Sequence, residues 1–347
     1  MPAAALLQRA VPVVLLAVLL LAIVAVAAVL PPSTQRIVTD AMVVLVAVIG
    51  LYTFVGNSGI LSFGHIGFMA IGAYSSAWLT IPPMTKKLLL PGLPDFLMQA
   101  HWDPVSATLA AGVVAAAVAL VFGLPLMRLS GIAASIGTFT LLAIVQSVAG
   151  NWKAMTGGQG SLFGLPAATD MYVALAWALV ALVGAFLYQN TRSGFRLNAS
   201  REDEVAARAV GVNVARERLT AFVLSAFFVG VAGALHAHFL GVIVASSYFL
   251  GLTFVTLAML VIGGINSLSG AVIGVVVVSL LGELLRRVEG GFDIGGQAVP
   301  ALPGLREVGL AGAMLLILVF RPSGLTRGRE IGWPLRKKVR VERSENA

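Results

Sequence analysis

The chain has 347 residues, of which 59% are hydrophobic and 11% are charged, and its mean hydropathy is +0.96. This mean hydropathy is far above what a water-soluble domain could keep in solution, so lipid is the expected solvent and a large soluble core is the less favoured interpretation. Because the sequence has no Cys, it also excludes disulfides, thiolate metal sites and Cys nucleophiles. We therefore expect an all-α, polytopic bundle of transmembrane helices.

Ten stretches are long enough to cross a bilayer, which takes about 20 residues. The first could be a signal peptide, since residues 25–27 resemble a cleavage site, but its apolar run is longer than the usual 15 residues or so, and we interpret it as a retained helix. Small residues spaced by four, such as Gly72 and Ser76, favour close helix packing. The predicted spans are residues 10–30, 36–56, 66–81, 105–127, 132–150, 171–189, 219–240, 249–265, 270–288 and 302–320.

Lys and Arg are distributed unequally between the two faces that these spans define. With the N-terminus inside, sixteen of the 23 lie on the cytoplasmic face and seven on the other. Cytoplasmic loops are enriched in these residues, so both termini are predicted to be cytoplasmic, in a multi-pass protein of the inner membrane. Residues 1–330 would form the transmembrane domain. The basic tail, 331–347, would set topology and face lipid, and its single Trp333 does not suggest nucleic-acid binding.

The third predicted span is short and follows a polar, Gly-rich stretch. Its 16 residues would reach only about 24 Å. A short helix after irregular polar backbone is typical of a broken transmembrane helix, where a solute can meet a helix N-terminus. The alternative is a tight cytoplasmic turn in which His65 bonds backbone carbonyls. As candidates for the lining of a solute path we take Asn57, Ser58, Ser62 and His65.

Two predicted outer loops, 82–104 and 151–170, are longer than the others. They contain several Pro residues, Trp102 and Trp152. Such loops could receive a soluble partner. Rigid turns with Trp anchored at the membrane interface explain the same residues.

A dense mixed-charge loop, about 190–218, separates the sixth and seventh spans. Ser200 with Asp203 three residues later predicts a capping box, and Gly211 suits the left-handed C-terminal position of a short helix. Glu204 and Arg208 would share one face of it. A helix of about ten residues is unstable alone in water, so we expect it to pack against another protein. The alternative is a solvated linker whose charge only fixes topology.

Several separated motifs resemble, in order, the permeases of high-affinity branched-chain amino acid ABC importers, specifically the LivM-like branch. The similarity extends over about 40–325. Residues 198–201 stand where the family has a more basic run, and Asn266 and Ala271 replace a Gly and a Pro. The motifs that carry the resemblance are 192–195 with 202–214, 59–65 with Gly67 and 72–74, 151–152 with 156–158 and 164–166, and 263–264 with Gly270.

The resemblance implies that the charged loop rests on ATPase subunits and couples their movement to transport. It also implies two ABC ATPase subunits, a second, LivH-like permease subunit and an extracytoplasmic substrate-binding protein. The chain itself would bind no cofactor, since ATP and Mg²⁺ would be used by the ATPases. The coupling residues that it implies are Arg192, Phe195, Arg201, Glu202, Glu204, Ala206, Ala207, Arg208 and Gly211.

A self-sufficient, ion-coupled secondary transporter is the competing hypothesis. Such a protein needs ionisable groups near the middle of the membrane. The predicted spans 105–127, 132–150, 171–189 and 249–265 contain no Asp, Glu, Lys or Arg. A membrane enzyme is also disfavoured, because the sequence offers no predicted catalytic residues and no metal-ligating cluster.

Overall fold

The computed structural model describes residues 3–290, 292–294, 297–299, 303–321 and 323–331. The tail beyond 331 lies outside these residues. Within them, eight helices are long and apolar enough to cross a membrane, and the predicted polytopic α-helical bundle is confirmed. The helices at the ten predicted spans are α1 (Ala3–Ala28), α2 (Pro32–Ser58), α3 (His65–Thr80), α6 (Pro104–Leu126), α7 (Gly131–Asn151), α9 (Met171–Gln189), α12 (Val214–Leu240), α13 (Leu250–Gly263), α14 (Leu268–Glu289) and α15 (Leu305–Phe320).

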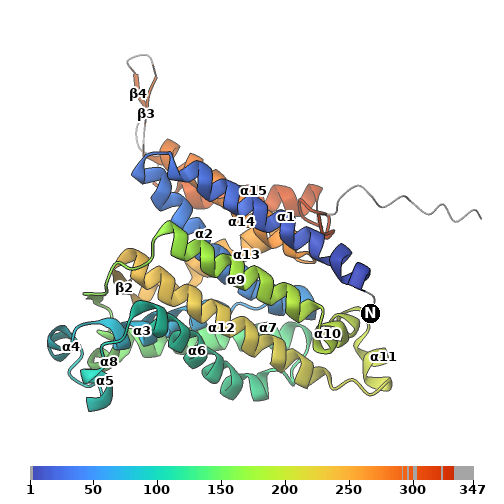
Figure 1. Ribbon diagram of the computed structural model, residues 1–347, viewed down its shortest axis with the longest axis horizontal. Helices are drawn as coiled ribbons and strands as arrows, with labels where there is room; N and C mark the ends of the chain where they lie inside the picture. Colours follow the sequence, from blue (N-terminus) through green and yellow to red (C-terminus); the bar gives the residue numbers. More distant parts are fainter. Residues whose placement is uncertain (1–2, 291, 295–296, 300–302, 322, 332–347) are drawn as a thin grey trace, which may run out of the picture.

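Helix α12 lies at the centre of the bundle and packs mainly against α2, α3 and α6. Figure 1 shows α13, α14 and α15 grouped with α1 on one side of α2 and α9, and α3, α6 and α7 on the other. Glycines allow the closest approaches. A Cβ on Gly72 would collide with the Gly230 carbonyl, and one on Gly233 would collide with the carbonyl of Met69. The predicted small-residue packing of α3 is therefore confirmed, through backbone contact with α12.

Short elements cover one end of the bundle, where the predicted outer loops lie. They are α4 (Pro83–Leu89), α5 (Asp95–Gln99), α8 (Lys153–Thr156), the 3-10 helix η1 (Ala245–Tyr248) and two antiparallel strand pairs. Strand β1 (Ser161–Phe163) pairs with β2 (Val242–Val244) in the register Leu162↔Ile243, and β3 (Phe292–Ile294) pairs with β4 (Gln297–Val299). Lys86 is buried, and its Nζ donates to the Leu97 carbonyl at 2.9 Å and to that of Ala100. The long outer loop is thus fixed on itself.

The opposite end carries α10 (Arg192–Glu202) and α11 (Glu204–Ala209) (Figure 1). This grouping agrees with the predicted alternation of inner and outer loops. Helix α12 begins at Val214, five residues before the predicted start of its span at 219. The side chain of Asn213 caps it by accepting a hydrogen bond from the Arg216 N–H at 3.1 Å. The first turn of α12 is polar and lies outside the apolar span. Hydropathy detects only the apolar span, so it misses this turn.

Candidate functional site

The charged loop folds as two short helices, so the prediction of one helix capped by Ser200 is wrong. Thr191 caps α10 by accepting from the Gly194 N–H at 3.1 Å, and this earlier cap places Ser200 inside the helix. The Ser200 hydroxyl instead donates to the Leu197 carbonyl at 2.7 Å. Asp203 caps α11, accepting from the Ala206 N–H at 2.9 Å. Because Asp203 has extended backbone, the chain turns between the two helices.

The left-handed position predicted for Gly211 is confirmed, with φ at +85°. Its N–H donates to the Arg208 carbonyl at 3.0 Å, and the Val212 N–H donates to the Ala207 carbonyl at 3.0 Å. These bonds satisfy carbonyls at the end of α11 that no further helical turn would reach. Gly211 therefore ends the helix and turns the chain toward α12.

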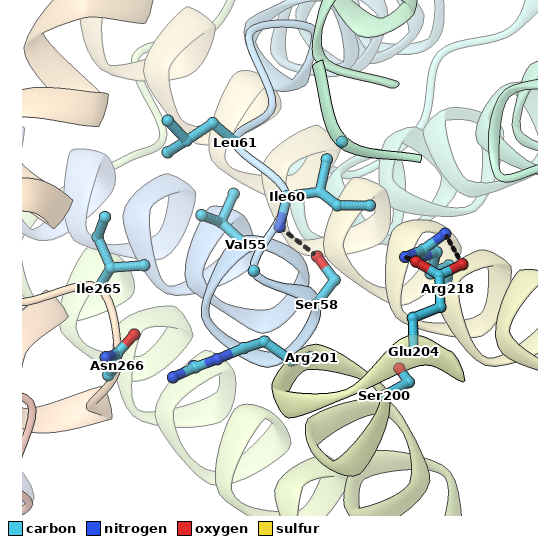
Figure 2. A pocket seen from close by; sticks show the side chains of 12 residues that line it. Val55, Ser58, Ile60, Leu61, Ser200, Arg201, Glu204, Arg218, Ile265 and Asn266 are labelled. Atoms are coloured by element: carbon cyan, nitrogen blue, oxygen red, sulfur yellow. Dashed lines mark hydrogen bonds and ion pairs between the residues drawn. The ribbon is translucent and has the colours of Figure 1, made fainter. Parts of the chain in front are cut away.

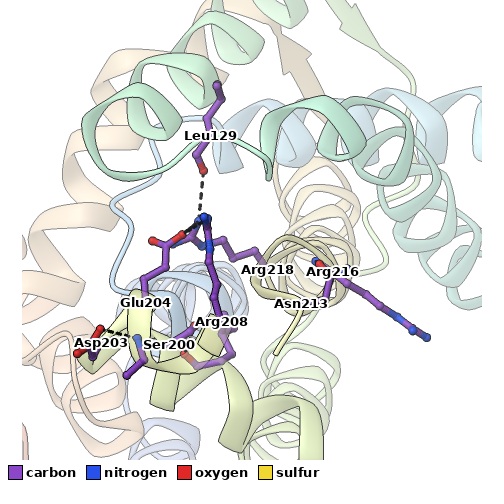
Figure 3. Close-up of polar contacts among 10 residues, drawn as sticks. Leu129, Ser200, Asp203, Glu204, Arg208, Asn213, Arg216 and Arg218 are labelled. Atoms are coloured by element: carbon purple, nitrogen blue, oxygen red, sulfur yellow. Dashed lines mark hydrogen bonds and ion pairs between the residues drawn. The ribbon is translucent and has the colours of Figure 1, made fainter. Parts of the chain in front are cut away.

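Glu204 fixes α11 to the bundle. Its carboxylate pairs with Arg208 at 2.5 Å, as the i,i+4 spacing predicts, and with Arg218 of α12 at 2.8 Å (Figure 3). Arg218 also donates to the Leu129 carbonyl, at 3.4 Å, just beyond the end of α6. Burial acts to raise the pKa of Glu204, but hydrogen bonds and charges from Arg218 and Arg208 outweigh it, and the net pKa is lowered. The carboxylate is thus charged at neutral pH.

Helix α10 holds the C-terminal end of α2, which is predicted to be cytoplasmic. The Asn198 amide donates to Asn57 Oδ1 at 3.1 Å, and Arg201 donates to the Gly56 carbonyl at 2.6 Å. On its other side, Arg196 pairs with Glu217 of α12 at 3.4 Å. Asn198 and Glu217 are absent from the predicted set, because their roles depend on which helices lie beside α10. A displacement of α10 would therefore reach two central helices directly.

Six of the nine predicted coupling residues are exposed, on the two helices or just after α11. Ala207 is buried, and Arg201 is partly buried. Val205 and Val210, which the prediction omitted, are 79% and 81% exposed. A charged surface with exposed apolar side chains is suited to contact with another protein. The exposed members of the predicted set are Arg192, Phe195, Glu202, Ala206, Arg208 and Gly211.

The four predicted lining residues of a solute path are all buried at the interruption between α2 and α3. The interruption itself is confirmed, since Gly59 ends α2 with φ +73° and α3 begins at His65. His65 Nδ1 lies 2.6 Å from Ser62 Oγ, so the alternative of a bond to a backbone carbonyl is wrong. The His65 ring is surrounded by the rings of Phe54, Phe68 and Phe222.

The interrupted segment, residues 59–64, packs against the first turns of α7. The Phe63 N–H donates to Thr138 Oγ1 at 3.2 Å, and the Ser135 hydroxyl donates to the Leu61 carbonyl at 2.7 Å. The Asn57 side chain donates to the Thr53 carbonyl and accepts from Asn198, so it joins the end of α2 to α10. That these side chains line a solute path stays a prediction.

A cavity of about 530 Å³ opens between helices α10 and α11 and the interrupted segment (Figure 2). It joins parts of the chain that the sequence separates widely. Of the predicted lining residues, only Ser58 reaches it, whereas two predicted coupling residues, Arg201 and Glu204, contribute charged groups to its lining. The cavity is lined by Val55, Ser58, Gly59, Ile60, Leu61, Gly131, Ser200, Arg201, Glu204, Arg218, Ile265 and Asn266.

The turn between α13 and α14 lies at the same end of the bundle and contributes Ile265 and Asn266 to the cavity. Gly263 and Gly264 bring the two helices into backbone contact around Gly270. The Glu330 carboxylate accepts from the N–H groups of Leu268 at 2.7 Å and Ser269 at 3.0 Å, at the N-terminus of α14. The segment that follows α15 therefore returns to fix this turn, an arrangement that no pattern in the sequence predicts.

Comparisons with known proteins place the chain among bacterial and archaeal transport proteins. The family model described as "Branched-chain amino acid transport system / permease component" matches residues 33–319. The chain is 28% identical to the high-affinity branched-chain amino acid transport system permease protein LivM of Escherichia coli, over 84% of this chain and 70% of that protein. It is 27% identical to the guanosine ABC transporter permease protein NupQ of Bacillus subtilis, over 68% and 75%. A probable branched-chain amino acid transport permease protein LivH of Methanocaldococcus jannaschii is 27% identical over 48% and 50%.

Proposed function

Since the chain belongs to the family of branched-chain amino acid transport system permease components, we propose that it forms, with partner subunits, the membrane path by which an ABC importer takes up branched-chain or other hydrophobic amino acids. The observation that carries the proposal is the cytoplasmic surface of α10 and α11, which is joined by hydrogen bonds and ion pairs to α2 and α12. A force applied there reaches the centre of the bundle without passing through a flexible linker.

The proposal assigns ATP hydrolysis to two partner ATPase subunits that contact α10 and α11. This chain is then a non-catalytic subunit that binds no cofactor, and ATP and Mg²⁺ bind to the ATPases. Exposed Val205 and Val210 support such a contact, because apolar side chains at an aqueous surface gain by burial against a partner.

The proposal also includes a second permease and an extracytoplasmic substrate-binding protein. Similarity to both a LivM and a LivH protein supports a related, LivH-like second permease. The binding protein would deliver the solute to the end of the bundle that carries α4, α5 and the β1–β2 strand pair. Similarity to a guanosine permease extends the proposal to other small solutes that combine an apolar part with polar groups.

Reconstitution tests the function directly. The chain is inserted into proteoliposomes alone and with its ATPases, second permease and binding protein, and uptake of leucine is measured with and without ATP. We expect uptake only in the complete assembly and only with ATP. Uptake by the lone chain, driven by a proton or sodium gradient, would instead establish a secondary transporter.

Two variants test the coupling role of α10 and α11. Gly211→Pro replaces a residue at φ +85° by one fixed near −65° and removes its N–H donor, and Glu204→Arg places a third positive charge beside Arg208 and Arg218. Both should raise the ratio of ATP hydrolysed to leucine transported severalfold, while membrane insertion is kept. The control is Gly312→Ala in α15, where an added Cβ would have nothing within 4 Å, and it should leave this ratio unchanged. Wild-type ratios in both test variants would remove the coupling role.

A further inference from the structure

We propose that the cytoplasmic cavity is a binding site for a zwitterionic amino acid with an aliphatic side chain, occupied from the cytoplasmic side, and that its occupation slows the transport cycle. The ligand class rests on the proposed function, but the site is argued from its own chemistry. A volume of about 530 Å³ lies within the range of roughly 300–1,000 Å³ typical of small-molecule sites.

Charged side chains lie on two different walls of this cavity. Figure 2 shows Arg201 extending toward Asn266 on one side, and the Glu204–Arg218 pair on the other. Arg201 donates to the Gly56 carbonyl through Nη1 and pairs with Glu202 through Nη2 at 3.5 Å. Each of these nitrogens has a second N–H, so the guanidinium keeps donors for a carboxylate. A single small ion would satisfy only one of the two walls.

Arg218 supplies a second, independent reason to expect an anionic group. Its side chain is only 6% exposed, and its Nε has no hydrogen-bond partner among the described residues. Buried polar groups in proteins almost always have partners. Arg218 lines the cavity, so a bound carboxylate would place negative charge near a guanidinium whose Nε, itself buried, the protein leaves unsatisfied.

The ammonium group of the ligand would lie near Glu204. This carboxylate has accepting capacity beyond its bonds to Arg208 and Arg218, since it offers about four lone-pair positions. Ser58 adds a hydroxyl oxygen on the same side of the cavity (Figure 2). Because Arg201 and Arg218 both line the cavity and Glu204 is its one carboxylate, the carboxylate of the ligand should contribute more to affinity than its ammonium.

An aliphatic wall faces these charges. Val55, Ile60, Leu61 and Ile265 line the cavity, and Leu61 is 40% exposed although it lies in the interrupted segment between two core helices. Figure 2 shows Val55, Ile60 and Leu61 across the cavity from Arg201, and Ile265 beside Asn266. A branched aliphatic side chain would remove them from water, which distinguishes the expected ligand from glycine or an acidic amino acid.

The position of the cavity beside the proposed coupling surface suggests that a bound ligand would regulate transport. A ligand there would touch α10, α11, the end of α2 and the α13–α14 turn at once, and these segments include the proposed coupling surface. Binding that joins them opposes any step in which they separate. High cytoplasmic solute would thereby slow further import.

The test uses the assembled transporter without its binding protein and without ATP, with radiolabelled leucine as the probe. We expect saturable binding. Leucine methyl ester, which lacks the carboxylate, and 4-methylpentanoate, which lacks the ammonium, should each compete at least about tenfold more weakly, as expected for loss of a charge-assisted hydrogen bond.

Variants assign the binding to this cavity. Leu61→Trp fills it and should lower leucine affinity at least tenfold, whereas Ile132→Trp, at an exposed position next to Gly131 but outside the cavity, should not. If Leu61→Trp does not fold, Leu61→Ala should still weaken binding severalfold. Arg201→Gln should weaken binding of leucine but leave that of 3-methylbutylamine, which has no carboxylate, unchanged.

Three outcomes would overturn the inference. They are no saturable leucine binding, competition by both analogues as strong as that by unlabelled leucine, or unchanged leucine affinity in the Leu61 and Arg201 variants. ATP hydrolysis by the complete assembly should fall when leucine is present only on the cytoplasmic side, and an unchanged rate would remove the regulatory role. The proposed function is judged separately by uptake. If the assembly takes up leucine but the cavity variants bind it normally, only this inference is contradicted. If leucine binding depends on the cavity but leucine is not taken up, only the proposed substrate is contradicted.

Discussion

Glu204 has one exposed partner, Arg208, and one buried partner, Arg218, and the sequence predicts only the first. A pair four residues apart follows from helix geometry alone. Arg218 lies 14 residues further on, and it reaches Glu204 because Gly211 reverses the chain before α12 begins. Local spacing therefore predicts the weaker contact, whereas the buried contact depends on the path of the turn.

We expect Glu204→Gln to lower stability by roughly 1–3 kcal/mol at pH 7, because it leaves the buried Arg218 without its counter-charge. The pKa of Glu204 is lowered in the folded protein, so its contribution is present above its ordinary value near 4.5 and disappears as the pH falls through the folded value. Thermal unfolding in detergent, measured from pH 7 to pH 3.5, should show wild type and variant converging in acid.

The matched control for this variant is Glu202→Gln, which removes a carboxylate that is 78% exposed and 3.5 Å from Arg201. An exposed pair of this kind contributes at most about 1 kcal/mol. Equal destabilisation by the two variants, or a difference from wild type that persists below the folded pKa of Glu204, would contradict the assigned role.

At the scale of elements, hydropathy predicts the existence of the ten main helices but not how the charged loop divides. Ser200, Asp203 and Thr191 are all acceptable N-caps by residue type. Thr191 starts a helix first, and that helix then includes Ser200, so the competition is decided by chain order and by the contacts of α10 with α2. For the same reason, the start of α12 follows from its cap and not from its apolar run.

Contact between α3 and α12 makes glycine necessary at their crossing. Gly233→Ala should destabilise the protein by about 1–3 kcal/mol or more, because its Cβ would collide with the Met69 carbonyl, and a backbone atom cannot rotate away. Gly312→Ala in α15 is the control, since nothing lies within 4 Å of the position of its Cβ. Thermal unfolding midpoints compare the two, and equal midpoints would show that the helices are not in this contact.

At the scale of the whole molecule, the inequality of Lys and Arg between loops predicts which end faces the cytoplasm. The structure groups α10 and α11 at one end and the short outer elements at the other, in agreement with that alternation (Figure 1). The cavity could not be predicted in this way, because its walls come from five separate regions of the chain that only the packed bundle brings together.

The chain contains no Cys, so single cysteines can report its orientation without background. Val210→Cys and Leu88→Cys place a thiol at positions that are 81% and 79% exposed, near opposite ends of the bundle. In intact cells, a membrane-impermeant maleimide should label Leu88→Cys only. Val210→Cys should react once the inner membrane is made permeable, and the reverse pattern would invert the topology.

The central position of α12 has a consequence for biosynthesis. Helices α2, α3 and α6 pack mainly against a helix that is completed only at Leu240, long after they have themselves been synthesised. Translation at about 5–20 residues per second separates the end of α3 from the end of α12 by roughly 8–30 s. During that interval the Gly72 surface of α3 has no partner in the nascent chain, so early helices must wait in the lipid, or beside the insertion machinery, until α12 enters the membrane.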